Sequence, residues 1–232
     1  MSFPVVMTSF SLRLDEVRDT INTLAQEESE QSTGALPSYS AEYRRLAGCC
    51  FVLLYGALEY GISNATRLAL QKLGGSGVHL CDLSYPLYCV ALDNHFESAA
   101  TVKSKKKWNA RLLLLAQQEY QQSINVSDSV FDAILQMTNI DVMQQIFAAF
   151  GIPDDVVPEP NLTNYVEEIK DKRNAIAHGR ESATSIGSGI TSKELAARCD
   201  AVNRVVTHYI SVLESWLASK SYIRSGSRHL YS

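Results

Sequence analysis

The sequence has few cysteines and no pattern that pairs them. There are five, an odd number, and no Cys-x-x-Cys pair occurs among them. We therefore expect buried free thiols in a reducing cytosol, and not a disulfide framework. The five residues are Cys49, Cys50, Cys81, Cys89 and Cys199.

Metal-ligand spacing is also missing. His79, Cys81, Cys89 and His95 lie in one region, but their intervals match no familiar zinc-binding pattern, and the region has no second pair of close ligands. We therefore predict neither a metal site nor a cofactor.

The sequence shows no secretory leader and no apolar run of membrane-spanning length. Residues 1–10 carry no positively charged segment ahead of an apolar stretch, and the longest apolar run, residues 49–58, is shorter than a bilayer requires. We expect a soluble, cytoplasmic protein with no membrane partner.

Excess positive charge is absent as well. Lys and Arg number 21 against 25 Asp and Glu, a net charge of −4, which argues against broad electrostatic adhesion to nucleic acid. Any RNA contact should therefore be focal. One dense basic run, Lys103, Lys105, Lys106 and Lys107, precedes Trp108, whose ring is suited to stacking on a base; the alternative is a solvated loop.

No useful length of the chain alternates apolar and polar residues as a strand does. Apolar residues recur instead at spacings of three and four, which predicts an all-α fold. With 46% hydrophobic residues, the chain can build a sizeable core. We expect a single domain over residues 1–221 and a mobile tail over residues 222–232.

The expected helices are separated by Gly, Pro and Ser clusters. Residues 74–104 are assigned as an irregular insertion with a short helix near 87–96. A Ser/Gly-rich loop covers residues 182–189, and Thr191 with Glu194 has the spacing of a capping box. The remaining predicted helices cover residues 12–30, 39–73, 108–123, 128–138, 141–150, about 161–178 and 191–221.

The helix over residues 161–178 ends in the heptapeptide Arg-Asn-Ala-Ile-Ala-His-Gly, residues 173–179. Asn161 or Thr163 can cap its start, and Gly179 has the position of a left-handed C′ residue. On an ideal helix, positions 173 and 178 are separated by about 140° and about 7.5 Å. The two side chains therefore share a face only if the backbone bends near residue 178.

Arg173 and His178 suit phosphodiester cleavage. An arginine holds the crowded phosphate anion with a permanent charge, and a histidine moves protons near neutral pH. The alternative is a well-made helix C-terminus, where a cation complements the dipole and glycine takes the cap. A second Arg/His pair, Arg224 and His229, has no helix to orient it.

The string from Lys172 to Gly179 resembles the signature of HEPN domains. This signature is an arginine, usually followed by a polar residue, with a histidine four to six residues after the arginine. Asn174 occupies the polar position. Residues 53–62 are similar to the early helix of the larger bacterial HEPN nucleases, which are often toxins or phage-defence effectors. The likeness covers residues 40–72 and 161–220.

This resemblance implies an all-α HEPN-like bundle, here with an irregular central insertion. It also implies a homodimeric, metal-independent endoribonuclease whose two motifs face each other across a cleft. A symmetric pair offers one neutral and one protonated imidazole, which a single histidine cannot. The implied partners are an RNA substrate, a second copy of the chain, and an antitoxin or regulatory protein.

The resemblance implies a role for each motif residue. Arg173 would neutralise the scissile phosphate, His178 would move the proton on the 2′- or 5′-oxygen, and Asn174 would orient one of them. The products would be a 2′,3′-cyclic phosphate and a 5′-hydroxyl. Arg180 stands where a subset of HEPN toxins has a modifiable tyrosine, so the resemblance does not extend to silencing by that modification. We include Arg180 among the candidate RNA contacts.

Glu59 is a further candidate, because it interrupts the most apolar stretch of the chain and a buried carboxylate requires a partner. It is placed to anchor Arg173 or His178; the alternative is a solvated carboxylate or a pair with Arg67. For the whole protein, the competing function is a non-catalytic helical module that binds RNA, a nucleotide or a protein partner.

Overall fold

The computed structural model describes residues 2–31, 39–103, 106–116 and 123–231. Within these ranges, helices are the only extended regular structure, and the β contacts are two isolated bridges, His79 with Ser123 and Leu83 with Ile223. The all-α prediction is confirmed.

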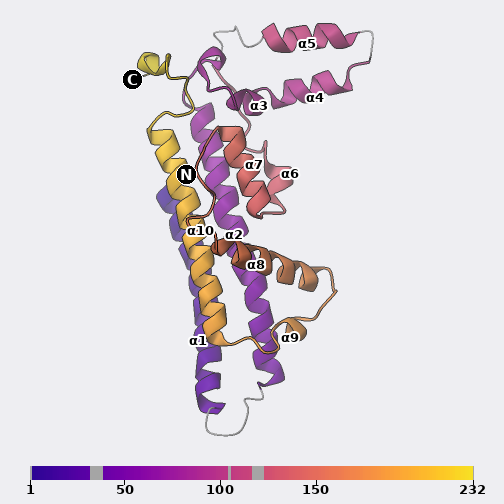
Figure 1. Cartoon of the computed structure of the whole chain (residues 1–232), viewed down its shortest axis with the longest axis vertical. Coiled ribbons are helices and arrows are strands. Elements are labelled where there is room, and N and C mark those ends of the chain that lie inside the picture. Colours follow the sequence, from indigo (N-terminus) through magenta and orange to yellow (C-terminus); the bar gives the residue numbers. More distant parts are fainter. Residues whose placement is uncertain (1, 32–38, 104–105, 117–122, 232) are drawn as a thin grey trace.

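Three long helices form the body of the molecule. Figure 1 shows α1 (Phe3–Gln31), α2 (Ala41–Gly74) and α10 (Ser192–Ala218) side by side along the long axis, with α8 (Leu162–Ala177) lying across α2 and α10. The Thr191–Glu194 capping box at the start of α10 is confirmed. Because α2 packs against α1, α8, α9 and α10, it is the central helix of the core.

The first helix starts earlier than predicted. We expected it from residue 12, but α1 begins at Phe3. Phe3, Val6 and Phe10 are buried and extend the stripe that continues through Leu14 and Val17. The short N-terminal segment thus belongs to the same amphipathic face, and the predicted start was wrong.

By length and composition, α2 is the one described helix able to cross a membrane. However, 61% of its most apolar window is buried inside the protein.

Two glycines of α2 permit close packing: a Cβ at Gly48 would lie 1.9 Å from the carbonyl oxygen of Ala183, and a Cβ at Gly61 would lie 2.5 Å from the Val206 side chain. Ala183 begins α9 (Ala183–Ile186), a short helix where a loop was expected.

The central segment contains short helices. The predicted helix over 87–96 is divided at Leu92 into α3 (Leu87–Ala91) and α4 (Asp93–Thr101). The helix expected over 108–123 is α5 (Lys107–Ala116) within the described residues, and the one expected over 128–138 shortens to α6 (Asp132–Leu135). It is followed by α7 (Ile140–Phe150). The 3-10 helix η1 (Leu80–Asp82) precedes α3.

The C-terminal residues are packed on the central segment instead of forming the expected free tail. Ile223 is buried, and the Arg224 side chain donates to the carbonyl oxygen of Leu83 at 2.9 Å and to the Tyr88 hydroxyl at 2.7 Å. The final 3-10 helix, η4 (Arg228–Tyr231), brings the Tyr231 hydroxyl within 2.6 Å of an Asp82 carboxylate oxygen. The partners are distant in sequence, so the local composition did not reveal them.

All five cysteines are free thiols, as predicted, but not all are buried. Cys50 and Cys199 lie in the core, Cys49 and Cys81 are partly exposed, and Cys89 is exposed. The expectation of buried thiols was therefore wrong for Cys89, which lies on an outer face of the short helix α3.

Candidate functional site

The predicted C-terminus of the motif helix is confirmed in detail. His178 is the C-cap, and Gly179 follows with φ of +66°. The amide of Gly179 donates to the carbonyl of Ile176 at 3.0 Å, and the amide of Arg180 donates to the carbonyl of Ala175 at 2.9 Å. This pair of bonds is a Schellman motif, in which glycine adopts the left-handed conformation at little cost. Asn161 occupies the N-cap, but its side chain makes no capping bond.

Ion pairs fix α8 against the rest of the core. Glu168 accepts two hydrogen bonds from the Arg198 guanidinium of α10, at 2.9 and 3.0 Å, and Lys172 lies 2.8 Å from the same carboxylate. Burial raises the pKa of Glu168, but the bonds from Arg198 and Lys172 outweigh it, and the pKa is lowered. The carboxylate is therefore charged near neutral pH and keeps α8 in register.

Arg173 is oriented by three neighbours. Its Nη1 donates to the Asn174 side-chain oxygen at 2.9 Å, its Nη2 lies 4.0 Å from Glu59 Oε2, and its guanidinium carbon lies 4.4 Å from the centre of the Tyr55 ring. The side chain is 31% exposed. A guanidinium has five N–H donors, so Arg173 is held in place and still has donors for a ligand.

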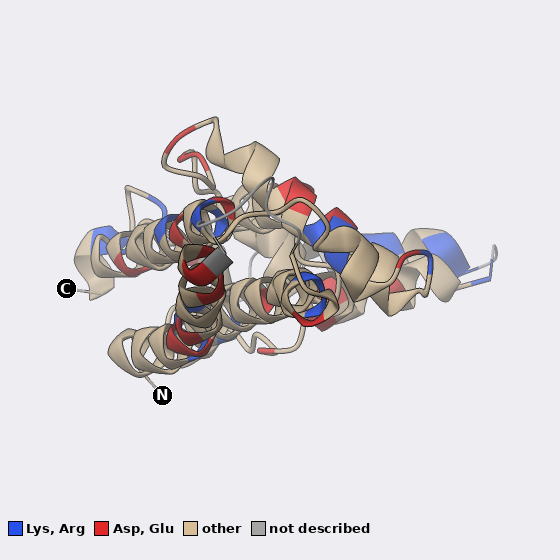
Figure 2. Cartoon of the chain, turned by 90° about the horizontal axis from the view of Figure 1, so that it is seen from below, with Lys and Arg blue, Asp and Glu red and all other residues tan. Residues whose placement is uncertain are grey.

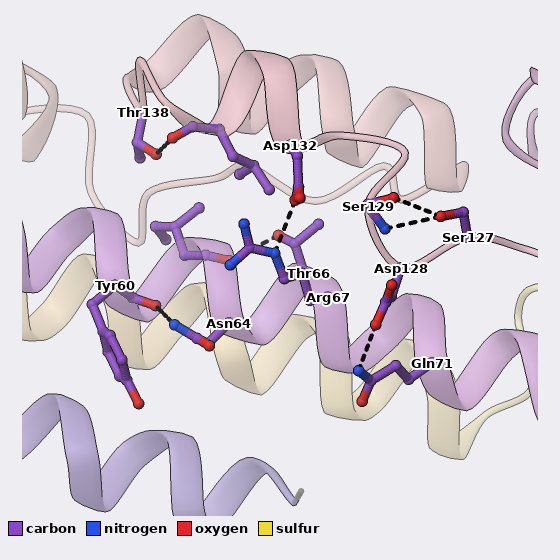
Figure 3. A network of polar contacts seen from close by, with 12 residues as sticks. Tyr60, Asn64, Thr66, Arg67, Gln71, Ser127, Asp128, Ser129, Asp132 and Thr138 are labelled. Carbon is purple, nitrogen blue, oxygen red and sulfur yellow. Dashed lines mark hydrogen bonds and ion pairs between the residues drawn. The ribbon is translucent and has the colours of Figure 1, made fainter.

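Of the partners considered for Glu59, the structure places Arg173 nearby, with its Nη2 4.0 Å from Glu59 Oε2. Arg67 instead donates from Nε to Asp132 Oδ1 at 2.9 Å (Figure 3). Burial raises the pKa of Glu59, and the nearby Arg173 charge only partly opposes this shift. Glu59 thus links α2 to the motif helix through a half-buried carboxylate.

His178 is exposed at the end of α8. Among the described residues, its imidazole has no hydrogen-bond or ion-pair partner. Helical geometry continues through Ala177, and the left-handed turn comes only at Gly179. The bend thus follows His178, so Arg173 and His178 keep the separation of about 140° around the axis that an ideal helix gives. The Arg180 side chain is likewise exposed and has no partner among the described residues.

The basic run lies apart from the motif. Lys105 lies outside the described residues, whereas Lys106, Lys107 and Trp108 are exposed at the start of α5. Arg111 lies 5.1 Å from the Trp108 ring. Figure 1 shows the α4–α5 pair extending from one end of the molecule, well away from α8. Figure 2 shows acidic and basic residues interspersed over the body.

A polar groove, which was not predicted from the sequence, lies beside the motif. It has a volume of about 420 Å³ and lies between α1, α2 and the α6 segment. Glu59, Ser63 and Arg67 line it at one-turn intervals along α2, and its charged and amide lining further includes Arg13 of α1, Asn64, Asp132 and Gln136. The available signal was the spacing of Glu59, Ser63 and Arg67, which places three polar side chains on one face of α2.

The described residues contain no cluster of three or more His, Cys, Asp and Glu side chains arranged to hold a metal ion. Within the candidate zinc region, His79 Nδ1 lies 4.0 Å from Asp82 Oδ2, and the His79 ring meets the Tyr231 ring edge-on.

Most of the chain matches the model of a known protein family. A model described as RiboL-PSP-HEPN matches residues 10–215, from α1 almost to the end of α10. The chain belongs to the RiboL-PSP-HEPN family. The searches of curated proteins and of solved structures found no match.

The match to the RiboL-PSP-HEPN model confirms the resemblance and extends it. The likeness seen in the sequence covered residues 40–72 and 161–220, whereas the family model also matches residues 10–39 and 73–160. HEPN domains are often ribonucleases, so membership supports a nuclease or RNA-related role. The site supplies chemistry suited to this role, with an oriented arginine and an accessible histidine at one helix end.

Proposed function

We propose that this HEPN protein is a metal-independent endoribonuclease that acts as a homodimer. The observation that carries the proposal is the contrast between two motif residues: Arg173 is oriented by Asn174, Glu59 and Tyr55, whereas the His178 imidazole is exposed without a partner in the described chain. A fixed charge and an accessible proton carrier are what phosphodiester cleavage needs.

In the proposed reaction, Arg173 binds a non-bridging oxygen of the scissile phosphate. A neutral imidazole takes the proton from the 2′-hydroxyl, and the 2′-oxygen forms a bond to phosphorus. The bond from phosphorus to the 5′-oxygen breaks, and a protonated imidazole gives its proton to that oxygen. The products are a 2′,3′-cyclic phosphate and a 5′-hydroxyl, with no net change in protons.

A homodimer supplies the two imidazoles that this reaction needs. His178 and Arg173 point about 140° apart on their own helix, so the two side chains of one chain are poorly placed to contact the same phosphate. Two copies related by a two-fold axis bring one neutral and one protonated His178 to a shared cleft. Asn174 and Glu59 then act as positioning residues for Arg173.

The biological role we propose is that of a cytoplasmic toxin or phage-defence effector. Its resemblance to the larger bacterial HEPN nucleases supports this role, and an antitoxin or regulatory protein would restrain it. Because Arg180 replaces the tyrosine that some HEPN toxins carry, we expect restraint through binding and not through modification at this position. Growth arrest on expression, relieved by His178→Ala, tests the role in cells.

The direct test is cleavage of a mixed RNA pool in EDTA by the wild type, His178→Ala and His95→Ala. His95 is a matched control, because it is an exposed histidine on α4, away from the motif. Wild type and His95→Ala should cleave and leave cyclic phosphates, whereas His178→Ala should not. Equal cleavage by His178→Ala would reject the assignment.

A binding module is the second candidate, and one observation favours it. The Schellman motif is complete without any ligand, and the charge of Arg173 already faces Glu59. RNA retained without cleavage by the wild type and by His178→Ala would select this alternative.

A further inference from the structure

One glycine of α2 has no packing role. A Cβ at Gly48 or at Gly61 would collide with neighbouring atoms, which explains both residues. A Cβ at Gly56, in contrast, meets no atom of the described residues within 4 Å. An interior glycine weakens a helix relative to alanine. Gly56 is thus an unfavourable helix residue at a position where packing within the described part of the chain does not require glycine.

Gly56 lies in the wall of the polar groove beside the motif. Glycine is favoured where a ligand must approach the backbone closely. The groove volume, about 420 Å³, is within the usual range of small-ligand sites. Open space over a glycine in a groove of this size points to a ligand that lies directly on the helix backbone.

Two arginines of the groove are held in fixed positions. Arg13 lies 3.7 Å above the centre of the Tyr60 ring and donates from Nη1 to the carbonyl of Ser9 at 3.1 Å. Arg67 is fixed by Asp132, and its side chain remains 40% exposed (Figure 3). Arginines oriented in advance bind phosphate groups with little loss of rotamer freedom.

Amide groups between the arginines suit the edges of bases. Asn64 donates from its side chain to the carbonyl of Tyr60 at 2.8 Å (Figure 3), so its side-chain oxygen remains as an acceptor. Gln136 also lines the groove. Side-chain amides and carboxylates pair with bases that are unstacked and exposed, as in single-stranded RNA.

Glu59 connects the groove to the motif. Glu59 lines it, and the same carboxylate lies 4.0 Å from Arg173. From Glu59 to Arg67, the lining follows one face of α2 for about 12 Å, given the rise of an α-helix. A strand whose scissile phosphate lies at Arg173 can therefore continue into the groove.

We propose that this groove is a subsite for the single-stranded RNA that flanks the scissile phosphate. Arg13 and Arg67 bind phosphates of the flank, Asn64 and Gln136 contact base edges, and the strand passes over Gly56. The choice of RNA as ligand rests on the proposed function. The subsite makes cleavage depend on RNA length.

The test fills the groove and, separately, removes a charge. Gly56→Leu places a side chain in open space on α2, with Val52→Leu, an exposed position one turn earlier and outside the groove, as its control. Arg13→Gln removes a guanidinium, with Arg18→Gln on the same helix as its control. Circular dichroism verifies that each variant remains helical.

Cleavage of a 12-nucleotide single strand is compared with cleavage of a dinucleotide. We expect Gly56→Leu and Arg13→Gln to lower the ratio of the two kcat/KM values at least tenfold, while both controls keep the wild-type ratio. An unchanged ratio in Gly56→Leu and Arg13→Gln would overturn the subsite even if the nuclease is active.

Binding is measured independently, so failure of the nuclease proposal does not hide the answer. In the His178→Ala background, the affinity for the 12-nucleotide strand should fall at least tenfold with Gly56→Leu. Arg13→Gln should also reduce the magnitude of the slope of log K against log salt concentration by about 0.7, the value for one lost phosphate contact. Equal affinity in His178→Ala with and without Gly56→Leu would reject the groove as an RNA site.

Discussion

Arg173 Nη2 lies 4.0 Å from Glu59 Oε2, and this contact joins the motif helix to the central helix of the core. Its partner Glu59 also lines the polar groove. One carboxylate therefore lies between the proposed catalytic arginine and the proposed RNA subsite. Changes at Glu59 should affect how Arg173 is oriented more than whether the protein folds.

Glu59→Gln should lower activity without lowering stability at neutral pH. Burial raises the pKa of Glu59 in the folded protein despite Arg173. Folding therefore favours the protonated carboxyl, and the free energy of unfolding of the wild type should fall as pH rises from the ordinary pKa through the folded one. We expect kcat to fall about tenfold, which corresponds to an assumed loss of about 1.4 kcal/mol in transition-state stabilisation. The free energy of unfolding of the variant should also depend less on pH in that interval. Lower stability of the variant at pH 7 would contradict this account.

Glu28→Gln should destabilise the fold without touching the motif. The Glu28 carboxylate accepts from the Ser192 amide at 2.7 Å, from the Ser192 hydroxyl at 2.6 Å and from the Tyr43 hydroxyl. Burial raises its pKa, but these bonds outweigh it, and the pKa is lowered. The stabilisation is present above the ordinary pKa and is lost as pH falls through the folded one. We expect a loss of about 1–3 kcal/mol at pH 7, measured by urea unfolding, with a smaller difference in acid.

Gly179→Ala should impair the site through the backbone. Gly179 has φ of +66°, a conformation that costs an alanine about 1–2 kcal/mol. Gly189, with φ of +79° and likewise open space at Cβ, is the matched control. Both variants should lose similar stability, but only Gly179→Ala should reduce RNA cleavage, because it displaces His178. Equal cleavage by the two variants would show that the cap does not position the histidine.

The exposed start of α5 tests the predicted RNA contacts outside the motif. Substituting Lys106 and Lys107 by Gln removes two cations. For binding to single-stranded RNA, the slope of log K against log salt concentration should become smaller in magnitude by about 1.4, at about 0.7 per contact. Trp108→Ala should cost about 1–3 kcal/mol if the indole stacks on a base. Leu112→Ala, on the same exposed helix, is the control. Unchanged affinity in the lysine and tryptophan variants would restrict RNA binding to the motif and its groove.

Features that depend on nearby residues could be predicted from the sequence. The periodicity of apolar residues predicts α2 and α10, the pair of Thr191 and Glu194 predicts a capping box, and Gly179 predicts the left-handed end of α8. Each of these involves hydrogen bonds or faces within a few residues, so the local sequence is sufficient.

Contacts between side chains that are distant in sequence depend on how the helices pack and could not be predicted in this way. Arg67 pairs with Asp132, 65 residues away, and so leaves Glu59 to Arg173. Arg224 binds the carbonyl of Leu83, 141 residues away, and fixes a segment that reads locally as a free tail. Periodicity states which face of a helix is apolar or polar, but the packing of distant helices determines what covers that face. The groove over Gly56 is open because the neighbouring helices, and not α2 itself, leave that part of its surface uncovered.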